Sequence, residues 1–68
     1  MTSYLFKYDL AVAYFPTVSP HTALKLFRRE LRHNSALWQA LLSANYRTTQ
    51  KRFTPRQVSL IYQYLGEP

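Results

Sequence analysis

With 68 residues, the chain makes one domain near the lower size limit for independent folding, which excludes a large internal catalytic cavity and places any function on the surface. Hydrophobic residues are 47% of the chain and cysteine is absent, so disorder, disulfides, thiolate nucleophiles and most structural zinc sites are excluded. The formal net charge of +6 favours polyanionic partners such as nucleic acid, acidic protein or anionic lipid.

The first predicted elements are a short strand and a short helix. Tyr4–Phe6 is an aromatic-rich run that indicates a brief strand or an extended arm. Asp9 suits the N-terminus of a helix over residues 8–15, which Pro16 ends because proline disfavours helical geometry in the residue before it. The longest apolar run here, Leu10–Phe15, is too short for a signal peptide and far short of the ~20 residues of a membrane span. We therefore expect a cytoplasmic location and no membrane partner.

The second predicted helix spans residues 20–32 and has one apolar and one basic face. Ser19 supplies a capping oxygen, and Pro20 is tolerated at the first helical position. The apolar positions recur at helical spacing and are Ala23, Leu24, Phe27 and Leu31. The basic stripe opposite Phe27 and Leu31 consists of His21, Lys25, Arg28, Arg29 and Arg32.

A third helix is predicted over residues 35–43, capped by Asn34. Its apolar stripe consists of Leu37, Trp38, Leu41 and Leu42. The segment 44–52 is polar and basic and lacks helical periodicity, so we expect an exposed loop or wing there. Phe53 interrupts this polarity, and we expect it to anchor the loop to the core.

The last predicted helix spans residues 55–65. Thr54, Pro55 and Gln57 fit a capping box with proline at the first helical position, and Gly66 is a natural C-terminal stop. The expected core consists of Leu10, Tyr14, Leu24, Phe27, Leu31, Trp38, Leu41, Val58 and Ile61. The predicted fold class is mainly α, a compact four-helix small domain resembling a helix-turn-helix, with a strand pair between Tyr4–Phe6 and Arg52–Phe53.

Several short sequence motifs are spread along the chain. They are Leu10-Ala11, Tyr14-Phe15-Pro16, Ser19-Pro20, Thr22-Ala23, Arg52-Phe53-Thr54-Pro55, Gln57-Val58 and Tyr64-Leu65-Gly66-Glu67-Pro68. On these motifs, which cover nearly the whole chain, it resembles a family of small proteins of unknown function from anaerobic gut bacteria. The resemblance implies no biochemical activity.

The order of the elements carries a second, more distant resemblance. The residues that carry it are Leu10-Ala11 in the first helix, Ser19 and Thr22 before the basic helix, and Tyr46-Arg47 with Phe53 in the wing. On these residues the chain looks like the winged helical DNA-binding heads of mercury-resistance-type regulators and phage excisionases. The likeness implies recognition of duplex DNA. The helix over residues 35–43 and Asn45, where a wing glycine is usual, differ from that pattern.

Positive charge is concentrated in the middle of the chain. Residues 25–56 hold eight of the nine lysines and arginines and one acid, Glu30, a net charge of +7. A basic helix of this kind can enter a major groove or follow phosphates, and the loop can add further phosphate contacts. The candidate nucleic-acid-binding residues are His21, Lys25, Arg28, Arg29, Arg32, Arg47, Lys51, Arg52 and Arg56. The alternative is an ordinary solvated face, although solvated helices usually intersperse the two signs of charge.

Aromatic residues leave a second function open. Tyr4, Tyr8, Tyr46 and Tyr62 would stack on bases if exposed, but in so small a domain burial in the core or at its rim is the stronger expectation. Exposed tyrosines and the C-terminal helix would instead suit a protein-interaction adaptor with a larger partner. DNA is favoured over RNA as the nucleic acid.

No residue pattern predicts catalysis, a metal or a cofactor. His21 and His33 lack a third ligand nearby, so no metal site is expected. Asp9, Glu30 and Glu67 form no plausible carboxylate pair, and no serine has the context of a nucleophile. We therefore expect a protein that is not an enzyme.

Overall fold

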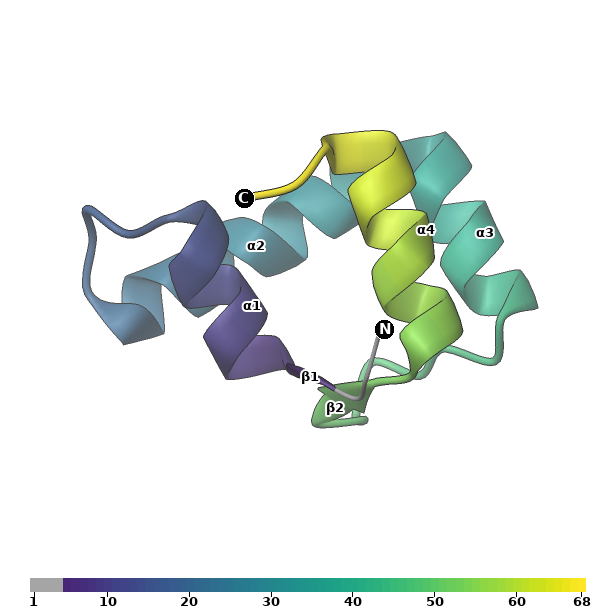
Figure 1. Cartoon of the computed structure of the whole chain (residues 1–68), viewed down its shortest axis with the longest axis horizontal. Helices are drawn as coiled ribbons and strands as arrows, with labels where there is room; N and C mark the ends of the chain where they lie inside the picture. Colours follow the sequence, from purple (N-terminus) through teal and green to yellow (C-terminus); the bar gives the residue numbers. More distant parts are fainter. Residues whose placement is uncertain (1–4) are drawn as a thin grey trace.

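Four helices follow one another along the chain, with one short strand before the first and another before the last (Figure 1). The computed structural model describes residues 5–68. Its elements are β1 (Leu5–Phe6), α1 (Lys7–Tyr14), α2 (Pro20–His33), α3 (Ser35–Ser43), β2 (Arg52–Phe53) and α4 (Pro55–Leu65). Each helix begins and ends within one residue of its predicted bounds. The fold class is confirmed: a mainly α small domain with a single short strand pair in the described part of the chain.

Side-chain caps explain where three of the helices begin. The Ser19 hydroxyl accepts a hydrogen bond from the Thr22 amide at 3.4 Å, and the Asn34 side chain accepts one from the Leu37 amide at 3.0 Å. Thr54 and Gln57 form the reciprocal capping box at the start of α4. All three predicted caps are thus confirmed.

The strand pair joins the start of the described chain to the segment before α4. Leu5 pairs with Phe53 and Phe6 with Arg52 in an antiparallel ladder. The Lys7 amide continues it by donating to the Lys51 carbonyl at 2.9 Å. This confirms the predicted pair for the described residues, while Tyr4, which we expected in the same strand, lies outside them. As a result, the first turn of α1 lies next to the loop that precedes β2 (Figure 1).

Phe27 of α2 lies in the middle of the core and is 1% exposed. Its ring stacks on Tyr14 at 5.6 Å between centroids and meets Phe53 edge to face at 6.0 Å. Phe53 is fully buried, which confirms that it anchors the loop. The other fully or almost fully buried apolar residues are Leu10, Ala11, Ala23, Leu31, Leu37, Leu41, Tyr46, Val58 and Ile61.

The predicted core needs two kinds of correction. Tyr14, Leu24 and Trp38 are only partly buried and pack against its edge. Leu37, in contrast, is fully buried, because α3 turns Leu37 and Leu41 inward and leaves Trp38 at the side. Helical spacing defines an apolar stripe but does not decide which of its margins meets the core.

The segment 44–52 is not the uniformly exposed loop that its polarity predicts. Asn45 has a φ of 64°, a left-handed conformation that asparagine tolerates better than most residues. The chain therefore turns back on α3, and the Tyr46 amide donates to the Leu41 carbonyl at 2.9 Å. The Tyr46 ring stacks on Phe53 at 5.5 Å and is 5% exposed, so it belongs to the core.

A buried polar network fixes this loop to the first turn of α4. The Gln57 side chain is 1% exposed, and its amide group donates to the Ala44 carbonyl at 2.9 Å. Its oxygen accepts from the Thr54 amide at 3.0 Å and from the Gln50 side chain at 2.6 Å. Both ends of the loop are therefore held by one side chain, which sets where the loop lies beside α2.

Candidate nucleic-acid interface

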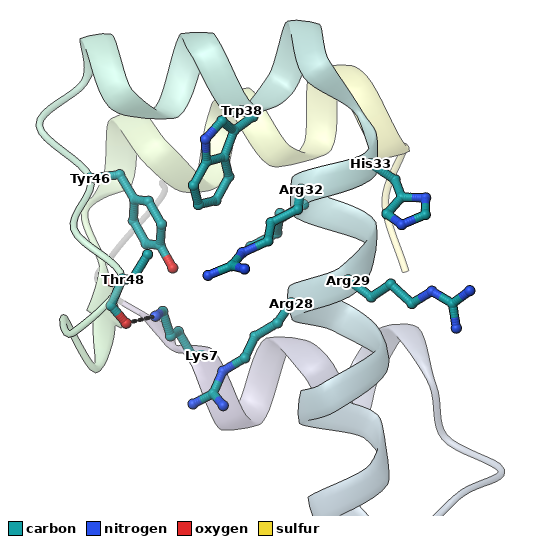
Figure 2. Close-up of a pocket in the computed structure, with 9 residues that line it drawn as sticks. Lys7, Arg28, Arg29, Arg32, His33, Trp38, Tyr46 and Thr48 are labelled. Carbon is teal, nitrogen blue, oxygen red and sulfur yellow. Dashed lines mark hydrogen bonds between the residues drawn. The ribbon is translucent and has the colours of Figure 1, made fainter.

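The basic residues of α2 divide into two rows in its second half. Residues four apart lie on the same line of a helix, so Arg28 stands above Arg32 and Arg29 above His33. Figure 2 shows the Arg28 and Arg32 side chains extending toward Lys7 and Tyr46, whereas Arg29 and His33 extend from the other side of α2. The side chains of the basic stripe predicted from the sequence therefore extend from two sides of α2.

A pocket of about 600 Å³ lies between this half of α2 and the loop after α3 (Figure 2). Its lining residues are Lys7, Arg28, Arg29, Leu31, Arg32, His33, Trp38, Tyr46 and Thr48. None of these lining residues is acidic, and Glu30, the one acid of α2, lines a separate pocket with Tyr14 and Leu65. The larger pocket is therefore a concentrated region of positive charge.

Lys7 lines this pocket but is not among the residues predicted from the sequence. It is 6% exposed, and its ammonium donates to the Thr48 carbonyl at 2.9 Å and lies 4.8 Å from the centroid of the Tyr46 ring. Burial lowers the pKa of the Lys7 ammonium below its usual value, and the positive charge of Arg28 lowers it further. No local pattern marks this residue, because the groups that bury it come from a distant part of the chain.

Tyr46 contributes its hydroxyl to the same space (Figure 2). Burial raises the pKa of the Tyr46 phenol, while the Arg28 and Arg32 guanidiniums act in the opposite direction. Arg32 in turn lies over the Trp38 ring, with its guanidinium carbon 5.8 Å from the ring centroid. Because Tyr46 is buried, its ring is not a platform for stacking bases; Tyr8 is 51% exposed, Tyr62 is partly buried, and Tyr4 lies outside the described residues.

The remaining predicted site residues are exposed but do not line this pocket. His21 and Lys25 lie on the first half of α2, and Arg56 on the first turn of α4. Arg47 and Lys51 lie in the loop, and the Arg52 guanidinium covers the Phe6 ring at 5.0 Å from its centroid. The structure thus gathers Arg28, Arg29 and Arg32, adds Lys7, and leaves the other predicted residues around them.

This arrangement can bind anions. Guanidinium groups present paired donors that match phosphate oxygens, and an ammonium supplies a point charge. Within residues 5–68 no three metal-ligating side chains come together, and no helix there has the length and apolarity needed to cross a membrane.

Residues 2–68 match the model of a family described as a domain of unknown function (DUF4248), so the chain belongs to that family. Comparisons with curated proteins and with solved structures give no match.

Proposed function

We propose that this member of a family of unknown function is a non-enzymatic cytoplasmic module that binds nucleic acid, with duplex DNA favoured over RNA. The contact surface is the second half of α2 together with the loop over residues 45–53. The observation that carries the proposal is that the exposed Arg28 and Arg32 lie together at a pocket whose lining contains no acidic residue. The exposed Arg29, Arg47, Lys51, Arg52 and Arg56 extend the positive charge around it.

Electrostatics supports this choice of partner. Like charges held close together destabilise a fold unless a counter-charge arrives, and the phosphates of nucleic acid supply it while releasing bound cations. The order of a short strand, a helix, a capped basic helix and a loop also suits a winged helix-turn-helix type of recognition. In that arrangement α2 faces the duplex and the loop reaches the neighbouring backbone.

The test is a titration of fluorescent duplex DNA over a range of salt concentrations. We expect binding at low salt that weakens steeply as salt rises, with micromolar or weaker affinity at physiological salt, as for one small module without a dimer partner. A duplex RNA of the same sequence is expected to bind less tightly. Absence of binding at low salt would refute the proposal.

The adaptor function remains the alternative, and exposed apolar side chains favour it. Phe6, Tyr8 and Tyr64 are 48%, 51% and 41% exposed, and aromatic residues are enriched in protein interfaces. An apolar protein interface would not release counterions, so its affinity would change little with salt. A partner captured through these side chains would lose affinity on Tyr8→Ala and Tyr64→Ala, whereas DNA binding would not.

A further inference from the structure

Lys7, Arg28 and Arg32 line a concave pocket. Binding to duplex DNA would not require such a pocket, because exposed cations on a helix face are sufficient to contact a duplex backbone. The charged groups of Lys7 and the two arginines face the same pocket from α1 and α2 (Figure 2). Lys7 lies at the inner end, where it is almost fully buried, and the two arginines are exposed at the mouth. A duplex backbone is a convex surface, so it reaches exposed arginines more easily than a buried ammonium.

The donors in the pocket exceed the acceptors that the described residues offer. A lysine ammonium has three N–H donors, and the described residues accept one of them, through the Thr48 carbonyl. Each guanidinium adds a planar fork of donors, and the Tyr46 hydroxyl lies beside them. The pocket is therefore suited to an acceptor-rich group with several oxygens.

We propose that this pocket binds the terminal phosphate of a nucleic-acid strand, with Lys7, Arg28 and Arg32 as the groups that hold it. A backbone phosphodiester carries a single negative charge, whereas a terminal phosphomonoester carries about 1.5 to 2 at neutral pH. Three cations match the second better than the first. The inference rests on the proposed function, because it names the part of the nucleic acid that this site would take.

The dimensions of the pocket agree with such a ligand. Its volume of about 600 Å³ lies within the range of roughly 300–1,000 Å³ typical of small-molecule sites, so the terminal phosphate can enter together with its sugar. Trp38 lines the same pocket under Arg32 and is the chain's one tryptophan. Its fluorescence is therefore a direct report of ligand binding at this site.

The first experiment compares two single-stranded DNA oligonucleotides of one sequence, labelled at the 3′ end, with and without a 5′ phosphate. We expect the wild-type protein to bind the phosphorylated strand roughly tenfold more tightly at equal salt, about the size of one charge-assisted hydrogen bond. Lys7→Met and Arg32→Gln should each abolish most of this preference. Gln63→Ala, at an exposed position of α4 that does not line the pocket, should leave the preference unchanged.

The second experiment follows Trp38 fluorescence on addition of inorganic phosphate, with potassium chloride at matched ionic strength as the control. A saturable change with phosphate and none with chloride is expected, and Arg32→Gln should remove it. A nucleoside 5′-monophosphate is then used to compete against the phosphorylated oligonucleotide. If the nucleotide binds more tightly than the phosphorylated oligonucleotide, the site is assigned to a free nucleotide, and the strand end is overturned as the ligand.

The two proposals fail differently. Equal affinity of the wild type for the phosphorylated and unphosphorylated strands would overturn the terminal-phosphate site, while salt-dependent duplex binding would still uphold the proposed function. A Trp38 response to phosphate without any binding of nucleic acid would refute the proposed function and the strand end together. Circular dichroism shows whether Lys7→Met folds. If Lys7→Met unfolds, Arg32→Gln still tests the proposal, because Arg32 is exposed and its replacement should not disturb the fold.

Discussion

The Lys7 ammonium lies 4.8 Å from the centroid of the Tyr46 ring, and this contact connects the first turn of α1 to the loop after α3. The negative face of an aromatic ring attracts a cation, so Tyr46 partly takes the place that a carboxylate holds in an ordinary ion pair. Tyr46 also belongs to the core, because its ring stacks on the buried Phe53. One side chain thereby closes the core and positions a cation in the pocket.

The ring of Tyr46 rather than its hydroxyl should carry its contribution to stability. Tyr46→Ala removes a buried aromatic ring, and we expect a loss of about 3–5 kcal/mol in the free energy of unfolding. Tyr46→Phe keeps the ring and should cost less than about 1 kcal/mol. Urea denaturation of the two variants measures the difference. Similar losses for both would show that the hydroxyl, not the ring, holds the loop.

Gln57 should matter more than any other polar side chain of α4. Gln57→Ala leaves the Ala44 carbonyl and the Thr54 amide without the partners they have in the fold, and we expect a loss of about 2–4 kcal/mol. Gln63→Ala, at an exposed position of the same helix, should change stability by no more than about 0.5 kcal/mol. Chemical denaturation compares them, and equal effects would contradict the network described above.

The Tyr14 phenol should make stability fall at alkaline pH. Burial, with smaller contributions from Tyr62 and Glu67, raises the pKa of Tyr14 from 10.0 to about 12, and its hydroxyl donates to the Gly66 carbonyl. Because the unfolded chain loses this proton first, the contribution is complete below pH 10 and is lost as pH rises toward 12.

The matched comparison for this effect is Tyr14→Phe, which lacks the titrating group while Lys7 and the other tyrosines remain. The wild type should be more stable than Tyr14→Phe below pH 10, and this difference should shrink between pH 10 and 12. Urea denaturation at a series of pH values measures it. A difference that stays constant across this interval would mean that the pKa of Tyr14 is the same in the folded and unfolded chains.

Local chemistry was sufficient to predict the helices, and tertiary contacts account for what was missed. Ser19, Asn34 and Thr54 mark helix starts because each supplies an oxygen to amides that follow within one turn. Burial of Lys7, in contrast, depends on contacts with Tyr46 and Thr48, which lie about forty residues away along the chain. Burial of Tyr46 agrees with the expectation that most tyrosines of so small a domain lie in the core or at its rim, whereas the burial of Lys7 was not predicted.

The same distinction applies to the candidate site. The basic positions of α2 are evident from the sequence, since helical spacing alone separates them from the apolar positions. The sequence does not show which structure the Arg28 and Arg32 side chains face. They face the loop after α3, and the position of this loop is set by Gln57 and by the turn at Asn45. For this reason the pocket and Lys7 became visible only in the structure.

The proposed function requires that the basic second half of α2 contacts phosphates. The most direct measurement is the salt dependence of duplex DNA binding by the wild type and by a variant with Arg28, Arg29 and Arg32 replaced by glutamine. All three side chains are exposed, so the variant should fold, which circular dichroism checks. If each arginine contacts one phosphate, the slope of log affinity against log salt should become shallower by roughly 3, at ~0.9 per contact. An unchanged slope would contradict the claim and place the contact surface away from α2.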